Sequence, residues 1–124
     1  ITLEQRGEEE WISCYELSTG DLLWSHIDGA VRFTEPMGGV GPRSTPTISG
    51  EQVFTLGANG DLRCLSVDDG SVRWAKIILD DAVAPNVEWA TTSRPLVVGD
   101  EVVVVSGGEN AHENPQRVRR GLNN

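Results

Sequence analysis

The stretch Cys14-Tyr-Glu-Leu-Ser-Thr-Gly20-Asp-Leu-Leu-Trp24 returns 50 residues later as Cys64-Leu-Ser-Val-Asp-Asp-Gly70-Ser-Val-Arg-Trp74. The cysteine, the glycine and the tryptophan coincide in the two copies. A second pair of segments repeats at nearly the same offset, because Ser44-Thr-Pro46 returns 49 residues later as Ser93-Arg-Pro95. Self-similarity at a fixed period of about fifty residues predicts a protein built from repeated supersecondary units.

The pattern within one unit indicates β-strands. Apolar residues alternate on both sides of Asn59-Gly60, a dipeptide typical of tight hairpins. Further turns are expected at Gly20 and Gly70, because glycine adopts positive φ without strain. No stretch of a dozen residues shows helical periodicity. The expected strands of the complete unit cover about 43–49, 52–57, 61–67 and 71–77, and a later unit has its first two strands within about 91–107.

Four antiparallel strands in about fifty residues are typical of one β-propeller blade. We therefore expect an all-β, partial β-propeller of about two and a half four-stranded antiparallel blades. Residues 1–27 would form the outer strands of a first blade, 28–78 a linker and a complete blade, and 79–108 a linker and the inner strands of a third blade. Residues 109–124 are polar, lack strand alternation and fail to match at the 50-residue offset, so we expect a disordered tail. A functional basic tail is the alternative.

Composition excludes several classes of protein. The chain has 124 residues and a formal net charge of −9 from 19 acidic and 10 basic residues, which disfavours binding to a nucleic-acid backbone. No apolar run approaches the roughly 18 residues of a membrane span. Two cysteines do not form a disulfide framework. Because the chain opens Ile1-Thr2-Leu3, we expect a fragment or a trimmed mature form, and the repeat indicates about a third of a complete propeller.

The string Cys14-x-Glu16-x-x-Thr19-Gly20-x-x-x-Trp24 resembles the tryptophan-docking motif of PQQ-like (pyrroloquinoline quinone-like) β-propeller repeats, Ala-x-Asp-x-x-x-Gly-x-x-x-Trp. Cysteine stands at the alanine position and Glu16 at the aspartate position. The second copy departs from the motif at Ser66, which replaces the acid. The resemblance covers roughly residues 1–107 and implies that each tryptophan packs between neighbouring blades. The implied structural set is Cys14, Glu16, Gly20, Trp24, Cys64, Gly70 and Trp74.

The resemblance includes quinoprotein dehydrogenases, which hold PQQ on the propeller axis with calcium and use a vicinal cysteine pair. Here Cys14 and Cys64 lie in separate repeats, poorly placed for a disulfide bond, and we expect both to be buried core thiols. Arg43, near the start of an inner strand, is the weak candidate for a cofactor contact, and Arg94 has a similar position. For both arginines, a solvated surface charge is the alternative.

No catalytic residue and no metal ligand is assigned. Asp80-Asp81 and Glu8-Glu9-Glu10 offer neighbouring carboxylates without the spacing of a calcium loop, and His26 and His112 have no partners at zinc-ligand spacing.

The resulting hypothesis is a non-catalytic scaffold or protein-interaction platform, as in BamB-like relatives. Its partners would be the remaining blades and a protein on the propeller face. The alternative is a fragment of a quinoprotein dehydrogenase that binds PQQ and calcium. The resemblance implies a periplasmic, cell-envelope or secreted location.

Overall fold

The computed structural model describes residues 1–30, 44–57, 61–77, 94–106 and 114–121, and every regular element in these ranges is a β-strand. The first sheet contains β1 (Thr2–Arg6), β2 (Glu9–Tyr15) and β3 (Leu22–Ala30). The second contains β4 (Thr47–Ser49), β5 (Gln52–Leu56), β6 (Asp61–Ser66) and β7 (Val72–Ile77). The third contains β8 (Leu96–Val98), β9 (Glu101–Ser106) and β10 (Asn114–Arg119). The expected all-β class is confirmed.

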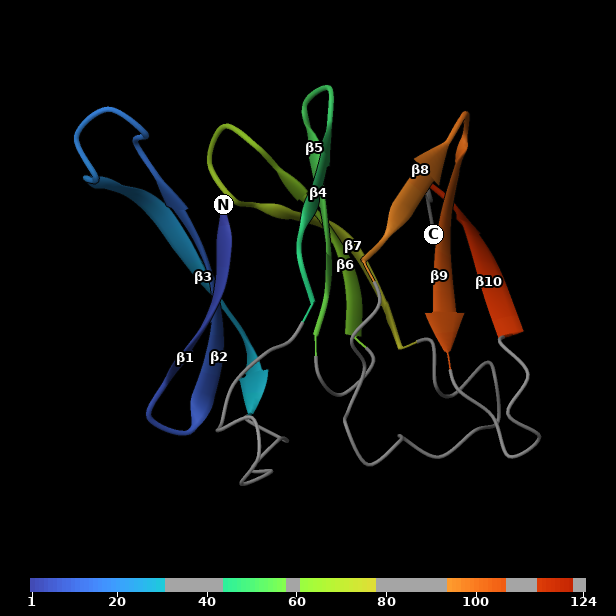
Figure 1. The fold of residues 1–124 in the computed structure, drawn as a ribbon, viewed down its shortest axis with the longest axis horizontal. Coiled ribbons are helices and arrows are strands. Elements are labelled where there is room, and N and C mark those ends of the chain that lie inside the picture. The colour runs from blue at the N-terminus through green and yellow to red at the C-terminus, as the bar shows by residue number, and fades with distance from the viewer. Residues whose placement is uncertain (31–43, 58–60, 78–93, 107–113, 122–124) are drawn as a thin grey trace.

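The three sheets stand beside one another, in chain order from blue to red (Figure 1). Each sheet is an antiparallel meander in which strands that follow one another in the chain pair with one another. Within the described ranges, no helix is long and apolar enough to cross a membrane.

The complete unit folds close to its expected strands. The first strand is shorter than expected, because β4 begins only after Pro46, which has no backbone N–H to give to a sheet. The hairpin expected around Asn59-Gly60 joins β5 to β6, with Leu56 opposite Leu62. Its turn, residues 58–60, lies outside the described residues, as do 31–43 and 78–93 of the expected linkers.

The two copies of the quoted stretch fold alike. Cys14 pairs across the sheet with Trp24, and Cys64 pairs with Trp74. In both copies the register shifts by one residue just after the cysteine, which marks a β-bulge.

The connecting turns of the two copies also correspond. Gly20 has a φ of 78° and Gly70 a φ of 75°, in the left-handed region that glycine tolerates best. Each of these glycines donates its N–H to the carbonyl at the acid position of the motif, Glu16 at 2.8 Å and Ser66 at 2.9 Å.

The expectation of a disordered tail over 109–124 is wrong for residues 114–119, which form β10. This strand pairs with β9 along its length, and Val118 lies opposite Val102. The third sheet therefore has one strand more than the two that we expected.

The reason is the length of one connection. In the second sheet the N–H of Val67, just after β6, donates to Glu51, and in the third the N–H of Arg120, just after β10, donates to Asp100. These bonds match β10 to β6 at an offset of 53 residues, whereas the preceding strands match at 49. The connection before β10 is longer than the one before β6, so β10 lies further along the chain than an offset of 50 residues predicts.

Both faces of the middle sheet are buried, each against a neighbouring sheet. On one side Val53 and Leu65 form a core with Ile12 and Trp24 of the first sheet. The other side forms the larger core with the third sheet: Phe54, Leu56, Leu62, Cys64, Trp74, Val102, Val104 and Val118. Because β-strand side chains alternate between faces, this arrangement explains the nearly continuous burial along β5 and β6.

Each repeat tryptophan reaches into the next sheet. The indole N–H of Trp24 donates to the carbonyl of Val67 at 2.8 Å, and that of Trp74 donates to the carbonyl of Arg120 at 3.0 Å. The Trp24 ring lies against Gly70, where a Cβ would come within 2.3 Å of the ring. A buried indole thus contributes both apolar area and a satisfied polar group to each junction.

We expect Gly70→Ala to lower the free energy of unfolding by about 2–4 kcal/mol, because the new methyl group would both displace the Trp24 ring and strain a positive φ. The matched control is Gly50→Ala, since Gly50 has a φ of 62° but nothing within 4 Å of its added Cβ. The control should cost only about 1–2 kcal/mol of backbone strain. Urea unfolding followed by circular dichroism measures both, and equal losses would contradict the packing role of Gly70.

Candidate functional site

An open groove runs between β4 and β8, the first strands of the second and third sheets. It encloses about 490 Å³ and is lined by Thr47, Ile48, Ser49, Arg94, Pro95, Leu96 and Val97. Ile48 and Leu96 are large apolar side chains that remain 55% and 59% exposed. β4 and β8 are also edge strands, which present backbone groups that no neighbouring strand of their own sheet takes up.

The two walls of the groove are joined by a polar contact. Thr47 donates its hydroxyl proton to the carbonyl of Pro95 and accepts a hydrogen bond from Nε of Arg94 at 3.2 Å. Arg94 is exposed, and the other described residues that line the groove are uncharged. A guanidinium has five N–H donors, and the Thr47 contact uses one of them. Arg43, the other arginine considered from the sequence, lies outside the described residues.

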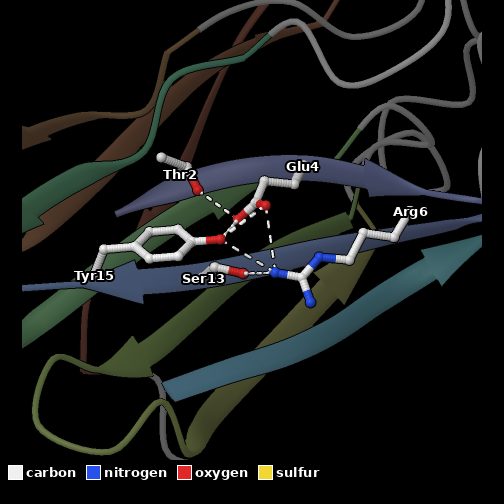
Figure 2. A network of polar contacts seen from close by, with 5 residues as sticks. All are labelled: Thr2, Glu4, Arg6, Ser13 and Tyr15. Atoms are coloured by element: carbon white, nitrogen blue, oxygen red, sulfur yellow. Dashed lines mark hydrogen bonds and ion pairs between the residues drawn. The ribbon is translucent and has the colours of Figure 1, made fainter. Parts of the chain in front are cut away.

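A second polar cluster lies on the outer face of the first sheet (Figure 2). The Tyr15 hydroxyl donates to the Glu4 carboxylate at 2.8 Å and accepts from the Arg6 guanidinium at 3.2 Å. Thr2 donates to the same carboxylate at 2.8 Å, and Arg6 also reaches the Ser13 hydroxyl at 3.4 Å. These five side chains come from two strands only, β1 and β2.

The network fixes the charge of Glu4. Partial burial on its own would raise the pKa of this carboxyl, but hydrogen bonds from Thr2, Tyr15, Ser13 and Arg6 lower it to about 2. Glu4 is therefore ionised at neutral pH and its oxygens are occupied by donors. Such a carboxylate stabilises the sheet face and is a poor general base.

A charged group is buried between the first and second sheets. Glu10 is only 2% exposed, and its charge partly offsets the lowering of the Arg63 pKa that burial causes. Burial, together with the positive charge of Arg63, lowers the pKa of His26 on the same junction. We interpret this cluster as structural, since the charges of Glu10 and Arg63 influence one another across packed sheets, and Arg63 also lies 3.8 Å from the Asp61 carboxylate of its own strand.

Arg120 is a residue that sequence reasoning missed, and it joins the second sheet to the third. Its Nε donates to the Gln52 side chain at 3.0 Å, and another guanidinium nitrogen donates to the carbonyl of Ser49 at 3.2 Å. The guanidinium carbon also lies 5.8 Å from the Phe54 ring centre. The signal available in the sequence was the alternation Arg117-Val118-Arg119, which is strand-like but falls in a polar segment.

The structure places the two cysteines in different sheets, and both are free thiols. Cys64 is buried, as expected, but the expectation is wrong for Cys14, which is only half-buried at the edge of the core between the first and second sheets. Among the described residues, no group of three or more His, Cys, Asp or Glu side chains could hold a metal ion.

Comparisons with known proteins agree with this fold. The sequence model of one family, described as outer membrane protein assembly factor BamB, matches residues 5–120. A comparison with curated protein sequences gave no match.

Several solved structures are similar. A quinohemoprotein alcohol dehydrogenase from Comamonas testosteroni matches with a TM-score of 0.63 at 13% identity, covering 96% of this chain and 19% of that protein. BamB from Moraxella catarrhalis matches with a TM-score of 0.51 at 15% identity, covering 86% of this chain and 29% of that protein. A europium-containing methanol dehydrogenase matches with a TM-score of 0.58 at 13% identity, over 97% of this chain and 24% of that one.

These likenesses concern the fold, and the expected partial β-propeller is confirmed, with the three sheets as consecutive blades. The chain spans less than a third of each of these three proteins.

Burial makes Cys64 unreactive, because it raises the pKa of this thiol from its ordinary 9.0 to about 11. We expect alkylation of Cys64 in a Cys14→Ser chain to be at least about 100-fold slower when folded than in urea, since the thiolate is the nucleophile. Mass spectrometry of iodoacetamide adducts measures both rates.

The same shift predicts how stability depends on pH. A thiol with a raised folded pKa contributes stability that is fully present below pH 9 and is lost as the pH rises toward 11. A chain with Cys64→Ala should therefore lose less stability between pH 9 and pH 11 than the unsubstituted chain. Equal pH profiles for the two chains would contradict it.

Proposed function

The chain belongs to the BamB family of PQQ-like repeat proteins, and from this premise we propose that it is part of a β-propeller that works as a non-catalytic scaffold, a platform for a protein partner. The observation that carries the proposal is the groove between β4 and β8, with its exposed apolar walls and one arginine. The proposal does not depend on the number of blades in the complete propeller.

The groove suits a segment of protein better than a small polar molecule. Ile48 and Leu96 offer apolar contacts, and the edges of β4 and β8 offer backbone hydrogen bonds to an extended chain. Arg94 adds a cation in a chain whose net charge is −9, so it favours a carboxylate at this point. We therefore propose a partner segment that carries apolar side chains and an acidic residue.

The polar clusters elsewhere support a structural rather than a catalytic role. The carboxylate of Glu4 is held by donors from its own sheet, and the Arg120 guanidinium is held by Gln52, the carbonyl of Ser49 and the Phe54 ring of the neighbouring sheet. Residues engaged in this way stabilise the platform and leave its exposed groove for recognition.

A quinoprotein dehydrogenase is the second candidate, and two of the similar structures favour it by their titles, an alcohol dehydrogenase and a methanol dehydrogenase. In that case Arg94 or Arg43 would contact the carboxylates of PQQ near the propeller axis, with calcium bound beside it. The described residues supply neither a vicinal cysteine pair nor a metal-binding group, so the remaining ligands would have to come from outside them.

The proposed platform works in the periplasm, at the cell envelope or outside the cell. This location is proposed from the family alone.

A photoreactive side chain in the groove tests for the protein partner. A photoreactive phenylalanine analogue at position 96 should give one discrete crosslinked protein in cells, and combining it with Arg94→Glu should reduce that product several-fold, because the acidic partner is repelled. The matched control is the same analogue at Leu17, which is fully exposed in a turn of the first sheet. The same product from both positions, or no product from position 96, would contradict the platform.

Adding the cofactor distinguishes the platform from the enzyme. The complete protein, incubated with PQQ and calcium, should show no alcohol-dependent dye reduction above a heat-denatured sample. Turnover that needs both PQQ and calcium would overturn the proposal and establish the dehydrogenase.

A further inference from the structure

The apolar core does not fill the first junction, which is the contact between the first and second sheets. Its buried apolar residues are Ile12, Trp24, Val53 and Leu65. The second junction, between the second and third sheets, has the larger core, which includes Val104. The position 49 residues before Val104 is Thr55, which lies on the same face of β5 as Val53. The first junction therefore holds a buried hydroxyl where the second holds a valine.

Charged side chains occupy the remainder of the first junction. Side chains alternate along a strand, so Glu10 lies on the same face as Ile12, and Arg63 on the same face as Leu65. His26 pairs with Ile12 across the sheet and shares that face. A carboxylate, a guanidinium and an imidazole thus lie between the two sheets. Glu10 is buried, and the side chain of Arg63 is only 20% exposed.

Two oxygens in this polar part of the junction are buried without a hydrogen-bond partner. They are Oε1 of Gln5, which pairs with Glu10 across the first sheet, and Oγ1 of Thr55, which pairs with Arg63 in the second. A buried polar atom that makes no hydrogen bond has lost its water without replacement, which costs free energy. Opening the junction would return water to both atoms, so this part of the junction is held less firmly than an apolar core.

The surroundings of His26 disfavour its charged form. Among the described side chains, the titratable groups that face it are Glu10 and Cys14 of β2 and Asp61 and Arg63 of β6. Arg63 lies 3.8 Å from the Asp61 carboxylate. Burial and the positive charge of Arg63 lower the pKa of His26. The imidazole is therefore uncharged at neutral pH, and the closed junction resists its protonation.

The charged side chains of the other strands lie elsewhere. Glu4 and Arg6 of β1 belong to the network on the outer face of the first sheet (Figure 2). On β7, Lys76 pairs with Leu62, a residue of the second core, and Arg73 is exposed. Arg63 is thus the cation that the second sheet presents to His26 in the described part of the chain.

We propose that the first junction is an acid-sensitive joint, in which protonation of His26 opens the contact between the first and second sheets while the second junction stays closed. The new positive charge would face the Arg63 guanidinium between packed sheets, and opening gives both cations water. Lys76 stands 50 residues after His26, so the second junction has no histidine at this position. The proposal is independent of whether the complete protein is a platform or an enzyme.

The sign of the pH dependence follows from proton linkage. His26 has a lower pKa in the closed junction than its ordinary value of 6.5. Closure is therefore unaffected by this group well above pH 6.5. As the pH falls below that value, the open form binds the proton more readily, so the open population increases.

The two indole N–H groups report on the two junctions separately. The N–H of Trp24 is bonded across the first junction and that of Trp74 across the second. We would measure hydrogen exchange of both by NMR in the complete protein labelled with ¹⁵N-tryptophan, from about pH 7.5 to about pH 5.5. The ratio of the two rates cancels the intrinsic pH dependence of indole exchange. This ratio, Trp24 over Trp74, should rise several-fold as the pH falls.

Substitutions assign the effect to its groups. His26→Gln keeps a polar side chain that does not titrate, so the ratio should become independent of pH. Arg63→Gln removes the facing charge and should reduce the rise, since burial alone then opposes protonation. The matched control is His112→Gln, which removes the other histidine of the chain and should leave the rise unchanged.

Several results would overturn the proposal. One is a ratio that stays constant in the unsubstituted protein, either because neither rate responds or because both indoles accelerate together. Another is a rise that persists in His26→Gln, because a carboxylate such as Glu10 or Asp61 would then be responsible. A rise that His112→Gln abolishes would place the titrating group outside the first junction.

Discussion

The structure depends on one interaction that it makes twice, an indole N–H given to a main-chain carbonyl of the next sheet. Trp24 makes it to Val67 and Trp74 makes it to Arg120. A single sheet of three or four short strands has two faces and no interior, so it needs neighbours on each side to exclude water. The tryptophan sets the distance and the register between neighbours, and the two apolar cores then form around it.

This dependence explains how much the sequence could predict. The two tryptophans bridge neighbouring sheets and the two glycines make tight turns at positive φ, so these residues recur at a constant spacing and reveal the fold. β10 requires no particular residue at a fixed position. It needs only a partner strand and alternating inward and outward side chains, and Val118 is its buried residue. A longer connection was enough to hide it. Arg120 was missed for a related reason, because its contacts with Gln52 and Ser49 arise only when two sheets meet.

The candidate site was predicted less well than the fold. The groove is made by β4 and β8, which are about fifty residues apart in the chain. No local sequence pattern predicts that the edges of these two strands lie side by side. Arg94 could be named from its place near an inner strand, but its bond to Thr47 depends on the packing of two blades. The free cysteines, by contrast, follow from the repeat itself, since equivalent positions of adjacent sheets do not meet.

The acceptor in each tryptophan junction is a carbonyl, and every residue has one. The side chain at that position takes no part in this hydrogen bond, and it is valine at 67 and arginine at 120. Mutation can change this side chain while the junction persists, and the arginine has taken on a second role by reaching back to the preceding sheet. Bonding through the main chain thus separates what keeps the architecture constant from what evolution is free to vary, blade by blade.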